Sequence, residues 1–404
     1  MRNLSKTLKT DFLIIGAGII GLTLAYNLKR LFPNKSVIVI DKEKSIGNHA
    51  SGRNSGVLHA GFYYTSDSLK ARFTREGNLT LTEYCEKKGL KINKCGKVVV
   101  VTSEEDIEVL YELKRRGEKN GVELYIIDEK ELQDLEPNAK TYQLALWSPR
   151  TSTVEPLEVL KAIKEDLEAL DVKIFFENPY IRKLNSNTVL SREFVIEAGK
   201  IINAAGLYAD KIAKDFGFGE DYVLIPFKGL YLEYLGEEKF LSKNVYPVPN
   251  IRNPFLGVHF TIKANGKIKI GPTATPCFWR ENYDYLANFR FSELTEILVW
   301  DLLLFLKNDS FRRLAFQEIS KYLKANMIKN ASKLVKNLPK GRYKWGKPGI
   351  RAQLVNRKTL ELVQDFVVEG DANSIHILNS VSPAFTASFP FTKYVIEKYI
   401  IGGN

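Results

Sequence analysis

The fold class is predicted by residues 12–28, whose sequence is Phe12-Leu-Ile-Ile-Gly-Ala-Gly-Ile-Ile-Gly-Leu-Thr-Leu-Ala-Tyr-Asn-Leu28. Its first four residues form an apolar run typical of a buried parallel strand. Gly16, Gly18 and Gly21 then follow with Gly-x-Gly-x-x-Gly spacing, and residues 22–28 have helical spacing. The first glycine permits a tight turn, the second lets a pyrophosphate approach the backbone, and the third lets helix and strand pack closely.

A second strand pattern, Val37-Ile-Val-Ile40, ends at Asp41 and Lys42. Asp41 lies about twenty residues past the last glycine, where the fingerprint has an acid that accepts hydrogen bonds from a ribose. The helix N-terminus meanwhile stabilises phosphates. Together these features predict a dinucleotide site, but NAD and FAD share adenosine and pyrophosphate, so the fingerprint alone does not distinguish them.

Residues 50–64, Ala-Ser-Gly-Arg-Asn-Ser-Gly-Val-Leu-His-Ala-Gly-Phe-Tyr-Tyr, favour FAD. Small residues at three steps let the backbone run close to a planar ring, and the side chains between them offer donors. This segment resembles the flavin-contacting stretch of the D-amino-acid-oxidase-like superfamily of FAD-dependent oxidoreductases. Within that superfamily the chain is most similar to the L-2-hydroxyglutarate dehydrogenase/oxidase family.

The resemblance extends along most of the chain in ordered blocks, which include 68–71, 226–229, 256–261, 349–354 and 379–388. One departure is Lys228, which stands where the family usually has arginine. A lysine offers a point charge rather than a bidentate fork, so carboxylate recognition there is less secure.

The resemblance implies an α/β fold with an α+β second domain. A discontinuous, Rossmann-like FAD-binding domain is expected from residues 1–90, 150–221 and 340–404. A substrate-binding domain with a mixed or antiparallel sheet is expected from 91–149 and 222–339. The residues expected to hold FAD are Gly16, Gly18, Gly21, Asp41, Lys42, Ser51, Arg53, Asn54, Ser55, His59, Gly61, Ala205, Gly206, Pro383, Ala384, Thr386 and Ala387. Some superfamily members link FAD covalently through a histidine at the place of His59; non-covalent contact is expected here.

The activity that the resemblance implies is the FAD-dependent oxidation of an L-2-hydroxy acid, foremost L-2-hydroxyglutarate to 2-oxoglutarate, by hydride transfer to flavin N5. The protein must supply a base. Of four histidines, His259 is expected to be that base, because the family places its strand over the flavin. A satisfied core histidine is the alternative. His376, in the strand pattern 374–378, is expected to be structural.

Arg351 is the first candidate to bind a substrate carboxylate, since its block returns to the flavin in the family; an interdomain salt bridge is the alternative. Tyr63 and Tyr64 alternate faces on an extended segment, so one can reach the substrate while the other packs. Lys228 and Arg280 are weaker candidates for the distal carboxylate.

The C-terminal block predicts a helix that begins near residues 386–388, after Ser382-Pro383. Pro390 then falls in the first turn, where proline is tolerated. The positive end of this helix dipole is expected to stabilise the reduced flavin.

Composition limits the partners. The chain has 404 residues, enough for two domains, with 45% hydrophobic and 26% charged residues, as in globular proteins. Three cysteines make neither a disulfide framework nor a metal site, and no metal is expected. The net charge of +12 comes from scattered lysines, so a solvated surface is favoured and no nucleic acid is expected.

The apolar run Ile297-Leu-Val-Trp-Asp-Leu-Leu-Leu-Phe-Leu306 is too short to span a bilayer. A buried helix is expected, and peripheral contact of residues 297–313 with an anionic membrane is the alternative.

The expected location is the cytoplasm or the inner face of the cell membrane. The expected partners are a small 2-hydroxy acid and an electron acceptor, oxygen or quinone. The alternative activity is that of another superfamily member, on an amino acid, a secondary amine or glycerol 3-phosphate.

Overall fold

The computed structural model describes residues 6–249, 257–319, 321 and 323–402 of the chain, which divides into two compact units. Unit 1 consists of Met1–Arg53, Pro156–Leu224 and Ala352–Asn404, and unit 2 of Asn54–Glu155 and Ile225–Arg351. The chain passes from one unit to the other inside two of its strands, β13 (Tyr222–Gly229) and β20 (Gly349–Asn356). Leu256, the first residue of one block of the family resemblance, lies outside the described residues.

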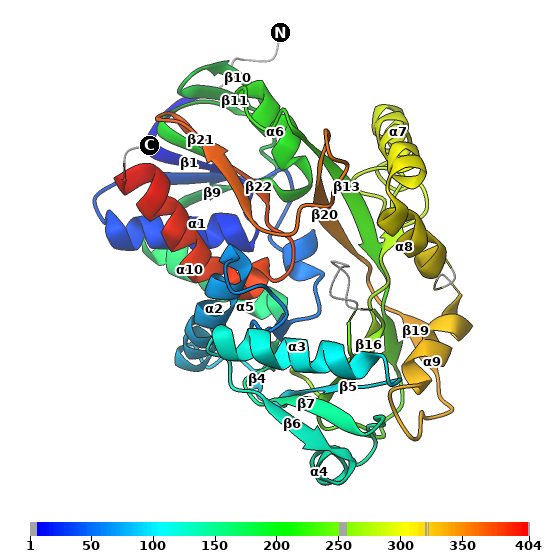
Figure 1. The fold of residues 1–404 in the computed structure, drawn as a ribbon. Helices are drawn as coiled ribbons and strands as arrows, with labels where there is room; N and C mark the ends of the chain where they lie inside the picture. Colours follow the sequence, from blue (N-terminus) through cyan, green and yellow to red (C-terminus); the bar gives the residue numbers. More distant parts are fainter. Residues whose placement is uncertain (1–5, 250–256, 320, 322, 403–404) are drawn as a thin grey trace. The chain divides into compact units, whose positions relative to one another are not determined.

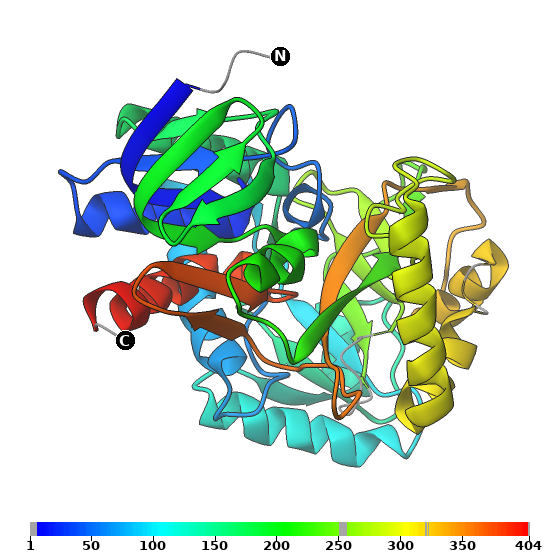
Figure 2. The same cartoon turned by 90° about the horizontal axis from the view of Figure 1, so that it is seen from above.

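Unit 1 contains an eight-stranded sheet with the order β10-β11-β12-β1-β2-β9, in which β22 pairs with β12 and β21 with β22. Strands β12, β1, β2 and β9 run parallel, as does β22 beside β12. Figure 2 shows β1, in blue, beside the green strands of this sheet. The strands are β1 (Lys6–Ile15), β2 (Val37–Ile40), β9 (Lys173–Phe175), β10 (Tyr180–Asn185), β11 (Thr188–Ser191), β12 (Phe194–Asn203), β21 (Val367–Gly370) and β22 (Ser374–Asn379).

The helices of unit 1 include α1 (Ile19–Leu31), which packs against α5 (Pro156–Ala169) and α10 (Ala384–Ile396), as Figure 1 shows for α1 and α10. The others are α6 (Ala209–Asp215), two short 3-10 turns, η1 (Ala50–Gly52) and η2 (Gly206–Tyr208), and a final π-turn, η4 (Glu397–Ile401). Helix α1 buries nine of its residues, so most of its surface is core.

The helix start expected near residues 386–388 is wrong. Helix α10 begins at Ala384, with Pro383 as its N-cap, and Pro390 lies inside it. An interior proline costs about 3 kcal/mol because it removes one backbone hydrogen bond and crowds the preceding turn. Burial of nine α10 residues offsets this cost. The Asn27 side chain of α1 also donates to the Phe389 carbonyl and to Thr392 Oγ1, at 2.9 Å each.

Unit 2 contains a mixed eight-stranded sheet with the order β19-β14-β17-β16-β15-β5-β7-β6, in which β15 and β5 are parallel. Its strands are β5 (Lys97–Val100), β6 (Tyr125–Asp128), β7 (Leu144–Ser148), β14 (Leu232–Tyr234), β15 (Asn244–Pro247), β16 (His259–Ile262), β17 (Ile268–Gly271) and β19 (Tyr343–Trp345). Val98 and Val100 pack into one core and Val99 into another, so β5 is covered on both faces.

The remaining strands form two three-stranded sheets. One consists of β3 (Val57–Leu58), β8 (Ser152–Val154) and β4 (Ile92–Asn93), and the other of β18 (Thr275–Pro276), β13 and β20. The unit 2 helices are α2 (Leu69–Lys87), α3 (Asp106–Lys119), α4 (Glu129–Leu135), α7 (Phe291–Lys307), α8 (Asp309–Ile319) and α9 (Lys324–Ser332).

The segments of the two units end at residues 53, 155, 224 and 351, whereas those expected from the sequence end at 90, 149, 221 and 339. The largest difference is the segment 54–90, which lies in unit 2 because β3 pairs with β8 and Asn78 of α2 donates to the Arg150 carbonyl at 3.2 Å. That the two units are the FAD-binding and substrate-binding domains stays a prediction.

The buried helix expected over residues 297–306 is wrong. Helix α7 buries Ile297 and Leu304 but leaves Val299 57%, Leu302 58% and Leu306 62% exposed. The apolar residues of α7 lie on all sides of the helix, but only one side packs against the rest of unit 2. Within the described ranges, no helix has both the length and the apolar character that crossing a bilayer requires.

Candidate flavin and substrate site

The glycine fingerprint forms the turn between β1 and α1. Gly16 has a φ of +109°, and its N–H donates to the Ile40 carbonyl at 2.8 Å. A Cβ on Gly16 would lie 2.6 Å from the Ala204 carbonyl oxygen, and one on Gly21 would lie 1.8 Å from the Gly16 oxygen. Neither position therefore accepts a side chain. Gly18 is the N-cap of α1, whose first-turn amide groups have no partners within the helix.

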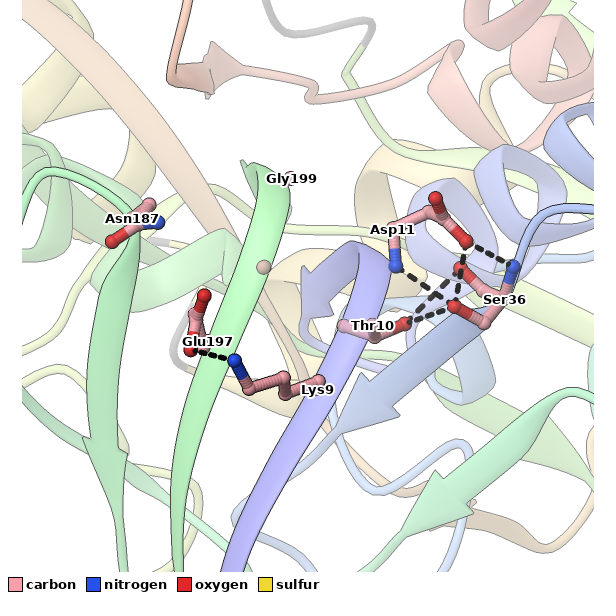
Figure 3. Close-up of a pocket in the computed structure, with 8 residues that line it drawn as sticks. Lys9, Thr10, Asp11, Ser36, Asn187, Glu197 and Gly199 are labelled. Carbon is pink, nitrogen blue, oxygen red and sulfur yellow. Dashed lines mark hydrogen bonds and ion pairs between the residues drawn. The ribbon is translucent and has the colours of Figure 1, made fainter.

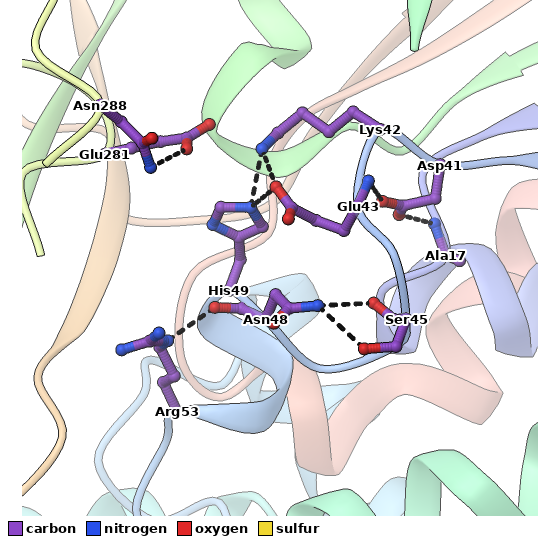
Figure 4. Close-up of polar contacts among 10 residues, drawn as sticks. All are labelled: Ala17, Asp41, Lys42, Glu43, Ser45, Asn48, His49, Arg53, Glu281 and Asn288. Atoms are coloured by element: carbon purple, nitrogen blue, oxygen red, sulfur yellow. Dashed lines mark hydrogen bonds and ion pairs between the residues drawn. The ribbon is translucent and has the colours of Figure 1, made fainter. Parts of the chain in front are cut away.

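Asp41 connects the end of β2 to this turn. Its Oδ2 accepts a hydrogen bond from the Ala17 N–H at 2.6 Å, and its Oδ1 accepts one from the Glu43 N–H at 2.8 Å (Figure 4). A carboxylate has about four lone-pair sites, so two backbone bonds leave acceptor capacity for hydroxyl groups. The role of Asp41 toward a ribose stays a prediction.

The loop after β2 is tied by its own side chains (Figure 4). Lys42 Nζ contacts the Glu43 carboxylate and lies 2.9 Å from His49 Nε2. The hydrogen bond from His49, together with the hydrogen bond and charge of Lys42, lowers the pKa of Glu43 to about 2. Arg53 Nε donates to the Asn48 carbonyl at 2.6 Å, and Figure 4 shows both side chains on this loop.

Ser51 fills the space opposite Gly18. Its Oγ accepts from the Ile19 N–H at 2.9 Å, and a Cβ on Gly18 would lie 3.0 Å from that oxygen. Ser51 thus holds the loop against the N-terminus of α1, whether or not it also contacts FAD.

Three parallel strands end beside this turn. Ala204, after β12, donates its N–H to the Ile15 carbonyl at 2.9 Å, which brings Ala205 and Gly206 to the same edge. Gly206 has a φ of +55° with open space around its Cβ position. Strand β22 runs parallel beside β12 and leads into α10, whose first turn contains Ala384, Thr386 and Ala387. Ligands of open α/β sheets bind at this carboxyl edge, so unit 1 fits a dinucleotide.

A surface pocket in unit 1 lies at the opposite end of β2, before the strand begins (Figure 3). Asp11 accepts from the Ser36 side chain at 2.8 Å there, and Lys9 pairs with Glu197 at 2.9 Å. These groups satisfy one another and lie at the amino end of the parallel strands, away from the glycine turn. The pocket is therefore not assigned to the cofactor.

In unit 2, the loop from His59 to Tyr64 is held by two amide side chains that the sequence analysis did not single out. Asn78 Nδ2 donates to the Leu58 and His59 carbonyls at 3.1 and 3.2 Å. Asn120 Nδ2 donates to the Gly61 and Tyr64 carbonyls at 3.0 Å each. No local motif identifies these asparagines, since their targets lie far away in the sequence.

The start of this loop is shaped by backbone geometry. Asn54 Oδ1 accepts from the Gly56 N–H at 2.8 Å, and Ser55 is partly buried. Gly61 has a φ of +105°, a conformation that L side chains rarely adopt. The contacts of Asn54, Ser55 and Gly61 with FAD remain predictions.

His259 begins β16 and is buried, with 4% of its surface exposed. Its Nδ1 lies 3.0 Å from the Gly257 carbonyl, so Nδ1–H donates there and Nε2 is the basic nitrogen. Burial, with the charges of Lys97, Arg351 and His59, holds the pKa of His259 well below its ordinary value, although the Gly257 contact acts in the opposite direction. His259 is therefore neutral at physiological pH and able to accept a proton.

The same charges act on His59. Burial first, then Lys97 and Arg351, hold the pKa of His59 well below its ordinary value. Burial raises the pKa values of Tyr63 and Tyr64. Arg351 is partly buried on β20, and its charge acts on Tyr64 as well as on the two histidines. We call His59, His259, Lys97 and Arg351 the histidine cluster.

The contacts given for the two weaker candidates are with other residues. The charge of Lys228 acts on the Cys277 thiol, and its carbonyl accepts from Thr275 Oγ1 at 3.1 Å. Arg280 is fully buried, with a guanidinium nitrogen 3.8 Å from the Glu296 carboxylate of α7. His376 is buried in β22 with its ring nitrogens near Asn203 and Ser374, consistent with a structural residue.

Comparisons with known proteins define the class. Residues 11–397 match the family model described as FAD dependent oxidoreductase. The fold is similar to that of an L-alpha-glycerophosphate oxidase from Mycoplasma pneumoniae solved with FAD bound, with a TM-score of 0.74, 22% identity, and coverage of 96% of this chain and 94% of that one. A glycine oxidase from Geobacillus kaustophilus gives a TM-score of 0.73 at 16% identity, covering 98% and 96%. The protein is an FAD-dependent oxidoreductase.

Its sequence is similar to a narrower group. An L-2-hydroxyglutarate dehydrogenase from Indibacter alkaliphilus is 35% identical over 403 residues, covering 95% of this chain and 97% of the relative. The mitochondrial L-2-hydroxyglutarate dehydrogenase of Homo sapiens is 32% identical over 416 residues, covering 98% and 89%. The chain belongs to the L-2-hydroxyglutarate dehydrogenase family. The family, the fold class and the cofactor expected from the sequence are confirmed.

Proposed function

We propose that this protein oxidises L-2-hydroxyglutarate to 2-oxoglutarate with FAD as cofactor. The observation that carries this proposal is identity of 31–35% with L-2-hydroxyglutarate dehydrogenases over nearly the whole chain. The histidine cluster supports it, because it combines neutral imidazoles with cations that suit an anionic substrate. Bound FAD supplies the acceptor for the hydride that leaves C2.

His259 is the proposed base. Its Nε2 takes the proton of the substrate hydroxyl, while the Gly257 carbonyl, 3.0 Å from Nδ1, keeps the ring oriented and stabilises the imidazolium that forms. The Tyr246 ring, stacked on the imidazole at a centroid distance of 3.6 Å, fixes the ring plane. A base must be unprotonated before the reaction, and the low pKa of His259 meets that need.

Arg351 is proposed to bind the carboxylate next to the hydroxyl-bearing carbon. Its charge lowers the pKa values of both histidines, so its field reaches the proposed base. A guanidinium is planar, always charged, and donates two parallel hydrogen bonds to a carboxylate. It therefore fixes the orientation of C2 as well as supplying charge.

We further propose that residues 297–313 contact an anionic membrane surface. The electron acceptor, oxygen or quinone, stays a prediction. Helix α7 presents Val299, Leu302 and Leu306 to solvent, and Lys307 and Arg313 follow in exposed positions. Exposed apolar side chains flanked by cations are typical of interfacial helices.

Turnover of the purified holoenzyme with an artificial electron acceptor tests the activity. We expect L-2-hydroxyglutarate to be oxidised and 2-oxoglutarate to accumulate in equal amount with reduced acceptor. Glycine, sarcosine and glycerol 3-phosphate serve as comparison substrates. Faster turnover of one of these, with none of L-2-hydroxyglutarate, would assign the chain to a different activity of the superfamily.

A further inference from the structure

Lys97, the first residue of β5, is a buried cation that the proposed chemistry has not yet used. None of its surface is exposed, and its ammonium has no hydrogen-bond partner among the described residues. A lysine ammonium carries three donors. Burying it without acceptors is costly, so such residues are rare unless they are paired.

The ammonium lies in an aromatic enclosure. Nζ is 4.2 Å from the ring centroid of Tyr246, 5.0 Å from that of Tyr63 and 5.4 Å from that of Phe62. These rings attract the charge but accept no hydrogen bond in the ordinary sense. The Tyr63 hydroxyl is likewise buried and lacks a partner in the described part of the chain. Two unsatisfied donors thus lie in one enclosure.

Tyr246 also links this enclosure to His259. The His259 imidazole stacks on the Tyr246 ring with centroids 3.6 Å apart and planes 15° apart. That stacking fills one face of the ring, so the Lys97 ammonium, 4.2 Å from the same centroid, lies over the other face. The proposed base and the buried cation are therefore separated by the thickness of one aromatic ring, on three adjacent strands, β16, β15 and β5.

We propose that the Lys97 ammonium and the Tyr63 hydroxyl bind the distal carboxylate of the substrate. This inference rests on the proposed function. In L-2-hydroxyglutarate the distal carboxylate is three carbon–carbon bonds from the hydroxyl-bearing carbon. With one hydrogen bond at each end, a substrate of that length spans the distance from the His259 imidazole to the Lys97 ammonium, which the Tyr246 ring separates. Arg351 is then left for the other carboxylate, so each end of the dicarboxylate meets its own cation.

Access requires one side chain to move. Tyr63 is partly exposed although its hydroxyl is buried, so a rotation of this side chain is the movement that the proposal requires. Lys97 has a flexible four-carbon stem, whereas the residues after it, Val98 to Val100, are fixed in the two cores.

The titration of Lys97 agrees with this placement. Burial lowers the pKa of Lys97 to about 7, and a carboxylate beside it favours the charged form. Lys97 lies over the rings of Tyr63 and Tyr246, its charge lowers the pKa values of His59 and His259, and Cys95 acts on the pKa of Lys97 itself.

The test compares two substrates that differ only at the distal end: L-2-hydroxyglutarate and L-2-hydroxyvalerate, in which a methyl group replaces the distal carboxylate. Lys97→Met should lower kcat/KM for L-2-hydroxyglutarate about 100-fold, as expected for a charged hydrogen bond lost in a buried site. It should change kcat/KM for L-2-hydroxyvalerate less than about threefold. Tyr63→Phe should reduce the preference for the dicarboxylate about tenfold.

A binding measurement avoids dependence on slow turnover of the monoacid. The shift in flavin absorbance of the oxidised holoenzyme gives Kd for 2-oxoglutarate and for 2-oxovalerate. We expect Lys97→Met to weaken only the former. Lys269→Met is the matched control, because Lys269 is also partly buried over a tyrosine ring, 5.3 Å from Tyr231, in the same sheet. It should change neither constant.

Equal losses for both substrates and both oxoacids, or no loss for either, would overturn the assignment of Lys97. If Lys97→Met fails to bind FAD, the Tyr63→Phe variant decides, since it removes a single hydroxyl. Failure of the proposed function has a different signature: the wild-type enzyme itself would not oxidise L-2-hydroxyglutarate.

Discussion

At the scale of single residues, His259 owes its fitness as a base to burial and to positive neighbours. Burial disfavours the imidazolium, and Lys97 and Arg351 disfavour it further. An anionic substrate would offset those charges on binding, so the imidazole gains basicity when the proton has to move.

Replacing His259 with Gln should depress kcat about 100-fold or more, because general-base catalysis contributes 10²–10⁴-fold. Glutamine preserves the donor to the Gly257 carbonyl but cannot take a proton. The flavin absorbance per protein should stay unchanged, which separates a catalytic loss from a loss of cofactor. Unchanged kcat would remove His259 from the base role.

The pH dependence follows from the same environment. Because the pKa of His259 lies well below its ordinary value of 6.5, protonation removes the base only at a pH well below 6.5. We therefore expect kcat/KM to show no loss as pH falls to 6.5, whereas deprotonation of the Lys97 ammonium, with a pKa of about 7, should lower it as pH rises. A half-maximal point on the acidic side at or above pH 6.5 would contradict a neutral, desolvated base.

Lys97 should cost stability in return for binding. Its folded pKa of about 7 is below its ordinary value of 10.5, so the desolvation penalty is fully present below pH 7 and disappears as pH rises toward 10.5. Lys97→Met should therefore stabilise the protein at pH 6, by on the order of a few kcal/mol. In urea unfolding this advantage should shrink at pH 9. A variant less stable than wild type at pH 6 would refute the penalty.

At the scale of elements, α10 shows tertiary packing overriding local preference. The amide of Asn27 reaches from α1 to the Phe389 carbonyl, beside Pro390, and to Thr392 Oγ1, so it ties the two helices together there. Asn27→Ala should lower the free energy of unfolding by about 2 kcal/mol, since two buried hydrogen bonds are lost. Asn34→Ala, in the exposed turn after α1, is the control and should change little. Equal stability of both variants would refute this role of Asn27.

Helix α7 belongs to the same scale, because its exposed apolar side chains act together. Leu302, 58% exposed, should tolerate Glu without loss of folding. If α7 contacts a membrane, Leu302→Glu should abolish co-sedimentation with vesicles that contain anionic lipid, and Leu184→Glu, at an exposed position of unit 1, should not. If the wild-type protein does not sediment with the vesicles, the membrane proposal is wrong.

At the scale of the whole molecule, the sequence predicted what local patterns encode. Gly16, Gly21 and Asp41 lie within one strand–turn–helix–strand unit, and their spacing alone predicted the dinucleotide turn. Lys97, Tyr246 and His259 meet because β5, β15 and β16 become neighbours in a sheet whose strands are far apart in the sequence. A lysine before four valines looks like the start of a strand, and nothing nearby reveals its aromatic enclosure. The start of α10 was missed because the packing against α1 that offsets its interior Pro390 joins residues far apart in the sequence.

The most direct measurement is the visible spectrum of the purified holoenzyme, recorded without oxygen before and after L-2-hydroxyglutarate is added. We predict two bands of oxidised flavin that bleach within the mixing time, while 2-oxoglutarate appears in an amount equal to the flavin. Bands that persist with L-2-hydroxyglutarate but bleach with glycerol 3-phosphate or sarcosine would contradict the proposed function.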